Sequence, residues 1–410
     1  MTKRDREILR DLAEQVAEVA AQPRSAEGKE RWYAQNCLQP GRPLVYASPE
    51  GSWVELLPEE VYRCEDDQAR SIEGDLRRRL YAAEHFDDDQ VCDAIFRVPR
   101  ALQVTGWGVE PVYTRPEAAR GAYVWDPPIK THADLDRLQT PQVTHDPEAT
   151  AQRVEFYEDL FGGLLQVELS GNRFGSCGLI DEWTRLRGIE QTFWDMTDDP
   201  QMVHEGMSRL RDGKLALMES LESQGLLTLN NGNHYTGSGA WGFCRELPQP
   251  DFEGTVRLKD LWGFAEAQTM SEVSPAMHEE FVLEYELPLL ERLGLNCYGC
   301  CEPLHRHLDT LKRRVPNLRR VSISPWADRK RSAEKLGSEI IYNWKPNPAA
   351  LAAVEFDADW VRQDIRQTVD IARANGCVLE MVMKDTHTCN QQPWRFDEWT
   401  RIAMEEAERW

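Results

Sequence analysis

The sequence predicts an α/β protein: a TIM (βα)8 barrel, in which eight parallel strands alternate with helices, preceded by an N-terminal extension. From about residue 150 onward, short apolar runs alternate with amphipathic segments of roughly 10 to 20 residues, and this alternation is typical of βα units around a parallel sheet. No glycine-rich phosphate loop follows an early strand, which favours a closed barrel over an open nucleotide-binding sheet. We therefore assign residues 1–130 to the extension and residues 131–410 to the barrel.

The extension is predicted to pack on the barrel as a helical and irregular layer. Apolar residues recur at helical spacing over residues 1–22, which predicts an amphipathic helix, and a second helix is expected over 66–84. The runs Pro43 to Ala47 and Ser52 to Leu57 are strand-like. The rest of this part is irregular and contains Pro, Gly and Trp residues, so we expect loops there.

In the barrel, each strand is expected to be an apolar run that ends in a polar cluster containing Gly or Pro. The expected strands cover 164–169, 226–229, 258–268, 291–295 with the residues that follow it, 318–323, 340–344 and 377–383. The expected helices cover 148–162, 179–187, 200–224, 275–293, 303–314, 329–336, 358–375 and 394–408. The third helix shows the start signal, because Asp198, Asp199 and Pro200 give it an acidic beginning with Pro in its first turn.

Composition and charge exclude several classes of protein. With 410 residues, of which 41% are hydrophobic, the chain can bury a large core. Its formal net charge of −22 argues against binding to nucleic acid or to an anionic membrane surface, since both need clustered Lys and Arg. No run of about 18 apolar residues is present, and residues 1–22 carry charges throughout, so neither a membrane span nor a secretion signal is expected. The ten cysteines lack regular short spacing, which predicts reduced thiols in a cytoplasmic protein.

The stretch Leu295 to His307, LNCYGCCEPLHRH, is dense in metal-capable side chains. An apolar run leads into it and Pro303 breaks it, which is typical of a buried parallel strand that delivers residues to its carboxyl end. Strand geometry divides the side chains between two faces: Tyr298, Cys300 and Glu302 on one, Cys297 and Cys301 on the other. Alternatively, these cysteines are small buried apolar residues of the core.

A metal site is predicted where the strand ends meet, because reactive groups gather at the carboxyl ends of barrel strands. Cys300 or Cys301 and Cys389 follow different strands, yet they would reach the same mouth. Two thiolates with a carboxylate or an imidazole form a plausible zinc set, so we predict these three cysteines as metal ligands. No CxxC or HExxH motif is present, and a loop thiol without a role is the alternative for Cys389.

Carboxylates and other polar residues at the same strand ends are predicted to handle the substrate. Glu302 and Asp385 are candidate general acids or bases, or groups that orient a metal ligand. The residues expected to bind substrate are His234, Gln268, His278, Tyr298, Trp326, Lys345, Asn347 and Lys384. Lys345 and Lys384 could anchor an anionic substrate, but a strand-end salt bridge is an equal alternative, as an exposed helix cap is for His278. No serine lies in a GxSxG elbow, so a Ser–His–Asp triad is not indicated.

Several motifs resemble the uroporphyrinogen decarboxylase superfamily over residues 127 to 410. The run IDEWTRLRGIEQTFWDMTDDP, residues 180–200, followed by Met202, Val203 and His204, is similar to that superfamily's Gly-x-Glu, acidic-acidic-Pro-x-x-Val-His pattern. The stretches YGCCEPLH, SISPWAD and KPNP look like the branch labelled trimethylamine corrinoid protein 2, which lies near the corrinoid-linked methyltransferases. The resemblance implies a TIM barrel and methyl transfer between a corrinoid cofactor and a thiol, a folate or a methylated substrate.

The resemblance also bears on cofactors. In the coenzyme M methyltransferases a His-x-Cys pair and a distant Cys hold zinc; here the pair corresponds to Tyr298 and Cys300, so the first ligand is replaced. The residues that would compensate are Cys301, Glu302, His387 or Cys389. The Asp-x-His-x-x-Gly signature of a corrinoid-binding domain is absent, so a corrinoid would arrive on a partner protein. The arginine-rich motif that grips porphyrinogen carboxylates is missing from residues 1–130, so porphyrinogen decarboxylation is not expected.

Three functions stay open on the sequence. The leading one is a methyltransferase, assisted by zinc, that moves a methyl group between a small methylated substrate or acceptor and a corrinoid carried by a partner protein. The second is a metal-independent decarboxylase or lyase that uses Lys345, Lys384 and Gln268 on a small carboxylate. The third is a non-catalytic partner that binds a corrinoid protein or a small ligand. A homodimer is expected only because it is the commonest oligomer.

Overall fold

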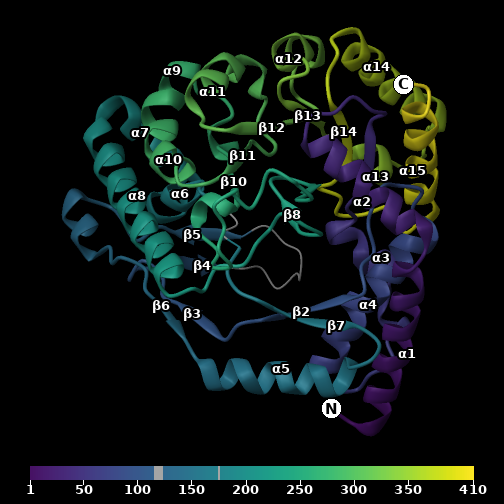
Figure 1. Cartoon of the computed structure of the whole chain (residues 1–410). Coiled ribbons are helices and arrows are strands. Elements are labelled where there is room, and N and C mark those ends of the chain that lie inside the picture. The colour runs from purple at the N-terminus through teal and green to yellow at the C-terminus, as the bar shows by residue number, and fades with distance from the viewer. Residues whose placement is uncertain (115–122, 174–175) are drawn as a thin grey trace.

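The computed structural model describes residues 1–114, 123–173 and 176–410, and Figure 1 shows its helices arranged around the strands of a central sheet. The strands are β1 (Leu44–Ala47), β2 (Ile95–Pro99), β3 (Leu102–Val104), β4 (Val112–Thr114), β5 (Val124–Asp126), β6 (Val143–His145), β7 (Gln166–Ser170), β8 (Tyr235–Thr236), β9 (Ala240–Trp241), β10 (Trp262–Ala265), β11 (Leu295–Tyr298), β12 (Leu318–Ile323), β13 (Ile341–Trp344) and β14 (Leu379–Met383). The α-helices are α1 (Lys3–Ala20), α2 (Pro23–Asn36), α3 (Trp53–Leu56), α4 (Asp67–His85), α5 (Pro147–Phe161), α6 (Ile180–Arg187), α7 (Ile189–Asp198), α8 (Pro200–Ser223), α9 (Pro275–His278), α10 (Glu284–Leu290), α11 (Leu308–Arg314), α12 (Arg329–Leu336), α13 (Ala349–Ala352), α14 (Ala358–Ala374) and α15 (Trp394–Ala407).

Six parallel strands form the main sheet, in the order β1-β14-β13-β12-β11-β10. The register pairs Val45 with Met381 and Val321 with Tyr342, so the carboxyl ends of the strands lie along one edge. A helix follows each of β10 to β14 in the chain, as βα units require. The predicted α/β architecture with a parallel sheet is therefore confirmed.

Closure of this sheet into an eightfold barrel stays a prediction. Beside the main sheet, β2 and β7 form a separate parallel pair, and one isolated parallel bridge joins Asn172, just beyond β7, to Leu227. Within the described ranges, no strand ladder connects β10 to this bridge or β1 to β2. The predicted strand 226–229 is accordingly reduced to a bridge.

Two polar side chains stand in for backbone pairing at these junctions. The Asn230 amide accepts from the Trp262 N–H at 2.8 Å and donates to the Trp262 carbonyl at 3.0 Å. At the other junction, the Asp89 carboxylate accepts the Val45 N–H at 2.9 Å. At the second junction one backbone bond remains, from the Asp89 N–H to the Val45 carbonyl at 2.8 Å. Because side chains occupy the other backbone groups, the neighbouring segments stay in contact without forming a ladder.

A glycine-rich hairpin, β8–β9, lies directly on one face of the main sheet. A Cβ added at Gly237 would come within 2.9 Å of the Cys297 Cβ, and one at Gly239 within 2.8 Å of a Val382 methyl group. Both glycines have positive φ, +60° and +94°, which other residues rarely adopt. The hairpin backbone therefore lies against β11 and β14, and it carries Ser238 between them.

The sheet face that meets the hairpin is polar and buried. Arg320 of β12 pairs with Glu380 of β14 at 3.0 Å, and neither side chain is more than 2% exposed. Asn343 of β13 donates to the same carboxylate and accepts from the Lys345 ammonium. Parallel strands are usually apolar on both faces, and this polar layer is an exception. It extends to Lys345, which directly follows β13.

The N-terminal part contributes one strand to the main sheet, because β1 pairs with β14. The expected helices 1–22 and 66–84 are confirmed as α1 and α4, which pack on each other. The prediction of a strand over Ser52 to Leu57 is wrong: a 3-10 turn, Glu50–Ser52, leads into α3. Spacing explains the error, since the more buried Trp53 and Leu56 are three residues apart and Val54 is exposed. The division at residue 130 stays a prediction.

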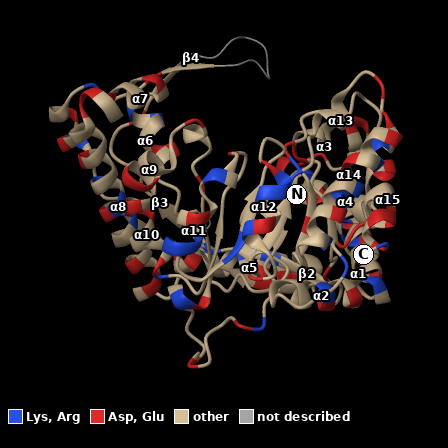
Figure 2. Cartoon of the chain, turned by 90° about the horizontal axis from the view of Figure 1, so that it is seen from above, with Lys and Arg blue, Asp and Glu red and all other residues tan. Residues whose placement is uncertain are grey.

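Most expected helices of the barrel part are confirmed, with one interruption. The expected helix 275–293 consists of α9, a π-helical turn over Glu279–Leu283 and α10, and Pro288 lies inside its last segment. Charged residues are spread over the outer helices, with acidic and basic positions interspersed along the ribbon (Figure 2). In the described part of the chain, no helix combines the length and apolar character needed to cross a bilayer.

Candidate functional site

Three polar groups meet where β11, β14 and the β8–β9 hairpin come together. Cys300 follows β11, Lys384 follows β14, and Ser238 lies in the turn of the hairpin. The Lys384 ammonium lies 3.7 Å from the Cys300 sulfur and 3.2 Å from the Ser238 hydroxyl oxygen. The Ser238 hydroxyl donates to the Cys300 sulfur at 3.2 Å. This triangle, which we call the thiol site, places a cation and a hydroxyl donor on one sulfur.

A second thiol and a carboxylate extend the thiol site. The Cys301 sulfur lies 3.5 Å from the Cys300 sulfur, and it donates to the Asp385 carboxylate at 3.5 Å. Asp385 in turn pairs with Lys384 at 3.0 Å, so the four side chains form a closed ring of contacts. The Glu50 carboxylate accepts the Asp385 N–H at 2.9 Å and lies 4.0 Å from the Lys384 ammonium.

The backbone at the end of β11 is held by Glu302. One carboxylate oxygen accepts the Cys300 N–H at 2.8 Å, and the other accepts the Ala267 N–H at 2.9 Å. Burial raises the pKa of Glu302, although these backbone donors oppose the shift. Gly299 has a φ of +93°, and a Cβ there would lie 2.3 Å from Leu304, so the turn requires glycine. Glu302 thus shapes the turn that presents Cys300, and both of its oxygens are occupied.

The surroundings of the two thiols separate their pKa values. The hydrogen bond from Cys301, opposed by burial, and the contacts with Ser238 and Lys384 lower the pKa of Cys300 to about 6. The pKa of Cys301 is raised, first by its hydrogen bond with Cys300 and then by burial and by the charges of Cys300 and Asp385. We therefore assign the shared proton to Cys301, which faces the carboxylate, and the negative charge to Cys300, which faces the ammonium.

Two lysines at the thiol site differ in charge. Burial disfavours the Lys384 ammonium, but the charges of Cys300, Asp385 and Glu50 outweigh it and raise the pKa of Lys384 to about 12. Burial, followed by the neighbouring charge of Lys384, lowers the pKa of Lys345 to about 7. At neutral pH, Lys384 is therefore a cation, and Lys345 is neutral in a substantial fraction of molecules.

The third predicted metal ligand, Cys389, lies in a different environment. Its thiol donates to the Glu55 carboxylate at 3.1 Å, and its N–H bonds the same oxygen at 2.9 Å. Burial and this carboxylate raise the pKa of Cys389 to about 11. Among the described residues, the sets of potential ligand atoms within 4.8 Å of one another do not include Cys300, Cys301 and Cys389. The structure therefore does not bring these three sulfurs within 4.8 Å of one another, and zinc binding by them stays a prediction.

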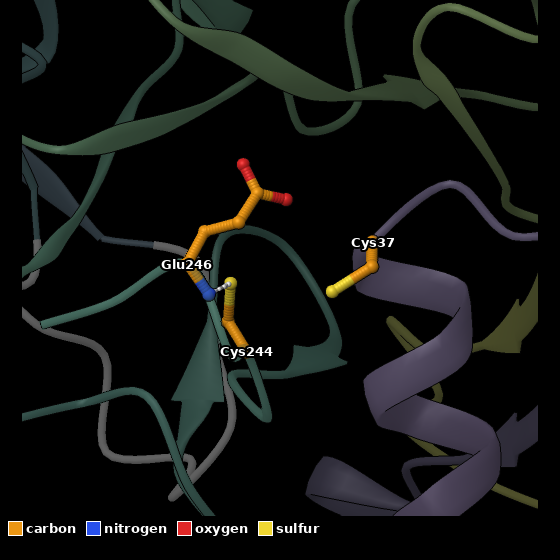
Figure 3. Close-up of side chains that lie close together, drawn as sticks. All are labelled: Cys37, Cys244 and Glu246. Atoms are coloured by element: carbon orange, nitrogen blue, oxygen red, sulfur yellow. Dashed lines mark hydrogen bonds between the residues drawn. The ribbon is translucent and has the colours of Figure 1, made fainter. Parts of the chain in front are cut away.

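One other group of potential metal ligands lies elsewhere in the described structure. Cys37, Cys244 and Glu246 have ligand atoms within 4.8 Å of one another (Figure 3). The Glu246 carboxylate, however, pairs with both terminal nitrogens of Arg319, at 2.6 and 2.8 Å. A guanidinium beside the carboxylate disfavours a second cation there, so we do not assign a metal to this group.

The remaining predicted substrate-binding residues are scattered. Gln268 lies at the surface and contacts Asp181, Trp326 is 67% exposed, and the Asn347 side chain accepts the Ala349 N–H at the start of α13. His278 and Tyr298 face the helices on the other side of the sheet, where the Tyr298 hydroxyl contacts His278 at 3.0 Å and donates to Glu286 at 2.9 Å. His234 lines a separate cavity, described below. Of the predicted residues, the structure brings together Cys300, Cys301, Lys384 and Asp385, with Lys345 close by.

Sequence reasoning missed Ser238 and Glu50. Ser238 lies in the polar segment 230–241, but only the contact between the hairpin and the sheet places its hydroxyl on Cys300. Glu50 belongs to a 3-10 turn, whereas the sequence predicts an irregular segment before a strand at this place. A signal for the first was available, because glycines flank Ser238 on both sides and mark a backbone that approaches another element closely.

Fold and site together define an α/β protein with a thiol–lysine centre at the carboxyl edge of a parallel sheet. No family model matches the chain, and no curated protein matches it. Among solved structures, it is similar to a methyltransferase from Methanosarcina mazei, with 10% identity over 93% of this chain and 98% of that one and a TM-score of 0.48. The resemblance to the uroporphyrinogen decarboxylase superfamily stays a prediction, and the chemistry is argued from the residues of the thiol site.

Proposed function

We propose that this chain is a methyltransferase in which the Cys300 thiolate receives the methyl group of a small cationic donor. The observation that supports this most directly is the contact of Cys300 with Lys384 and Ser238, which favours a thiolate at neutral pH. The thiolate, rather than the thiol, is the nucleophile. The resemblance noted in the sequence supports the choice of a methyl group as the transferred group.

The charge of the thiol site favours a cationic donor such as a quaternary ammonium or a sulfonium ion. One ammonium, Lys384, is surrounded by the Cys300 thiolate and the carboxylates of Asp385 and Glu50. Burial raises the pKa of Glu50, and the charge of Lys384 opposes this shift. The remaining excess of negative charge attracts a cation and repels an anion.

The step is an in-line displacement. The Cys300 sulfur attacks the methyl carbon, an S–C bond forms, and the bond from that carbon to the cationic nitrogen or sulfur breaks, with its electron pair going to the leaving group. The leaving group departs neutral, so no proton is needed. A thiolate of low pKa is also a good leaving group, so Cys300 can release the methyl group to an acceptor nucleophile. The resemblance favours a corrinoid on a partner protein as that acceptor.

Methyl labelling tests this proposal. The full chain is incubated with trimethylsulfonium or tetramethylammonium, and peptides are analysed by mass spectrometry. We expect one methyl group on Cys300 in the native protein, none in Cys300→Ser, and an unchanged mark in the control Cys37→Ser. Absence of the mark, or equal methylation of other cysteines, would contradict the proposal. Elemental analysis is a separate check, since one zinc per chain that is lost in Cys300→Ser would support the predicted zinc site.

One observation favours a second candidate, a lyase that acts through an amine. Lys345 is buried, its pKa is lowered to about 7, and its neutral amine could add to a carbonyl group with loss of water. Gln268, the third residue predicted for such an enzyme, does not join the two lysines. Borohydride reduction in the presence of pyruvate would leave a stable adduct on Lys345 if this candidate were correct.

A further inference from the structure

A cavity of about 310 Å³ lies between the N-terminal helices and the segment 233–241. It borders the thiol site through Tyr235 of its lining, because burial and then the charges of Glu50 and Cys300 raise the pKa of Tyr235. Its walls come from the turn between α1 and α2, from α4 and β2, from Arg173 beyond β7, and from the segment that contains His234 and Trp241. Neither Cys300 nor Lys384 belongs to its lining. The cavity is therefore a second candidate binding site, with its own chemistry.

The cavity lining has an excess of positive charge in a chain whose net charge is −22. The charged residues of the lining are Arg24, Arg78, Arg79, Arg97 and Arg173, and Asp75, Asp88 and Asp93. Each aspartate has an arginine partner within the lining: Asp75 with Arg79, Asp88 with Arg24, and Asp93 with Arg97, at 2.8, 3.8 and 2.6 Å. Arg78 and Arg173 are left without an ion pair in the part of the chain that the structure describes. Two uncompensated guanidinium groups on one cavity favour an anionic ligand.

The wall also contains buried polar atoms that lack hydrogen-bond partners. His234 is only 7% exposed, and neither of its ring nitrogens has a partner among the described residues. The same holds for Arg97 Nε, Asn233 Oδ1 and Trp241 Nε1. Leaving such groups unpaired in the interior is unfavourable, so a polar ligand or ordered water is needed to satisfy them.

The arginines act on the histidine through their charge. Burial, followed by the positive charges of Arg97 and Arg173, lowers the pKa of His234 to about 3. His234 is therefore a neutral ring that can donate one hydrogen bond and accept another. Burial and the charge of Arg97 lower the pKa of Arg173 as well, so the two guanidiniums share one positive field. An anion placed between them relieves this repulsion.

The rest of the lining is apolar or aromatic. Trp53, Trp241 and Val91 belong to the wall, so part of a ligand would lie against rings and methyl groups. Inorganic phosphate or sulfate would use the arginines alone, whereas an organic anion would use both parts of the wall.

We propose that this cavity binds a small organic carboxylate, with its carboxylate group on Arg173 and a hydrogen bond from the neutral ring of His234. A guanidinium binds a carboxylate through two parallel N–H···O bonds, which suits Arg173, one of the two arginines without an ion pair. A cationic ligand would meet two unpaired arginines, and an apolar one would leave the polar atoms of the wall unsatisfied. This inference does not depend on the proposed methyl transfer.

Calorimetric titration of the full chain at low ionic strength tests the proposal, with succinate, benzoate and inorganic phosphate as probes. We expect at least one of the two carboxylates to bind, and Arg173→Gln to raise its Kd at least about tenfold, as for loss of a charged hydrogen-bonded pair. The matched control is Arg292→Gln, which removes one surface positive charge outside the cavity and should leave the Kd unchanged. If Arg173→Gln does not fold, the affinity of the native protein for the carboxylate is measured at increasing concentrations of sodium chloride. We expect the affinity to decrease, and an affinity that does not change would contradict the proposal.

Three results would overturn it. The first is that neither carboxylate binds at millimolar concentration. The second is that Arg173→Gln binds as tightly as the native protein. The third is that phosphate binds more tightly than both carboxylates, which would make the cavity a site for inorganic anions only.

Discussion

Cys300 and Cys389 both follow strands of one parallel sheet, yet their surroundings are opposite. Cys300 contacts an ammonium, a hydroxyl and a second thiol, whereas Cys389 donates to the Glu55 carboxylate. The pKa of the first is lowered to about 6 and that of the second is raised to about 11. The difference shows that position at a strand end does not make a thiol reactive. Burial, together with the hydrogen bonds and charges that face the sulfur, decides whether the thiolate forms.

The largest expected effect on this comparison comes from Cys301→Ala. The substitution removes the hydrogen bond that contributes most to the low pKa of Cys300. We expect the pH midpoint of Cys300 alkylation to rise by about 2 units, towards the value of an ordinary thiol. Iodoacetamide labelling at a series of pH values measures this midpoint, with Cys37→Ala as the control. An unchanged midpoint would show that Cys301 does not stabilise the thiolate.

A smaller effect is expected from Lys384→Met, which removes the ammonium 3.7 Å from the Cys300 sulfur. Loss of the cation should raise the alkylation midpoint by about 1 unit, which corresponds to about 1.4 kcal/mol. Lys335→Met is the matched control, because Lys335 pairs with Asp309 at the surface, away from the thiol site. Equal alkylation midpoints of Cys300 in the two variants would show that Lys384 does not stabilise the thiolate.

The smallest expected effect is a change in the free energy of unfolding, and it concerns the surroundings of Cys389. Glu55→Gln replaces a carboxylate that accepts hydrogen bonds from the thiol and N–H of Cys389 and from the N–H of Gln391. We expect the free energy of unfolding to fall by about 1 kcal/mol, because these charge-assisted bonds become neutral ones. Urea unfolding measures the change. Glu59→Gln, at an 86% exposed side chain, is the control and should have almost no effect.

Much of the parallel sheet could be predicted because its signals are local. The strand 318–323 and the helix 329–336 have the predicted bounds, since Ser324 and Pro325 mark the end of the strand and an aspartate cap, Asp328, marks the start of the helix. The segment 226–229 failed as a strand for a reason that is not local: the Asn230 side chain occupies the backbone groups of Trp262. The polar layer of Arg320, Asn343 and Glu380 could not be predicted either, because buried parallel strands are expected to be apolar.

Of the thiol site, only the residues that closely follow a strand could be predicted from the sequence. Cys300, Cys301, Lys384 and Asp385 lie within three residues of a strand end, so strand geometry carries them to one edge. Cys389 lies further along the loop after β14, where the position of Glu55 decides its direction. Ser238 and Glu50 come from a hairpin and a turn, and their places depend on tertiary packing that no spacing in the sequence reveals.

The most direct test of the difference between Cys300 and Cys389 compares the two thiols in the same native molecule. The full chain is labelled with iodoacetamide between pH 5 and 10, and the alkylation of each cysteine is followed by mass spectrometry. We expect a midpoint near pH 6 for Cys300 and almost no labelling of Cys389 below pH 9. A midpoint for Cys300 near that of a free thiol, about 8.5, or labelling of Cys389 at the rate of Cys300, would contradict it.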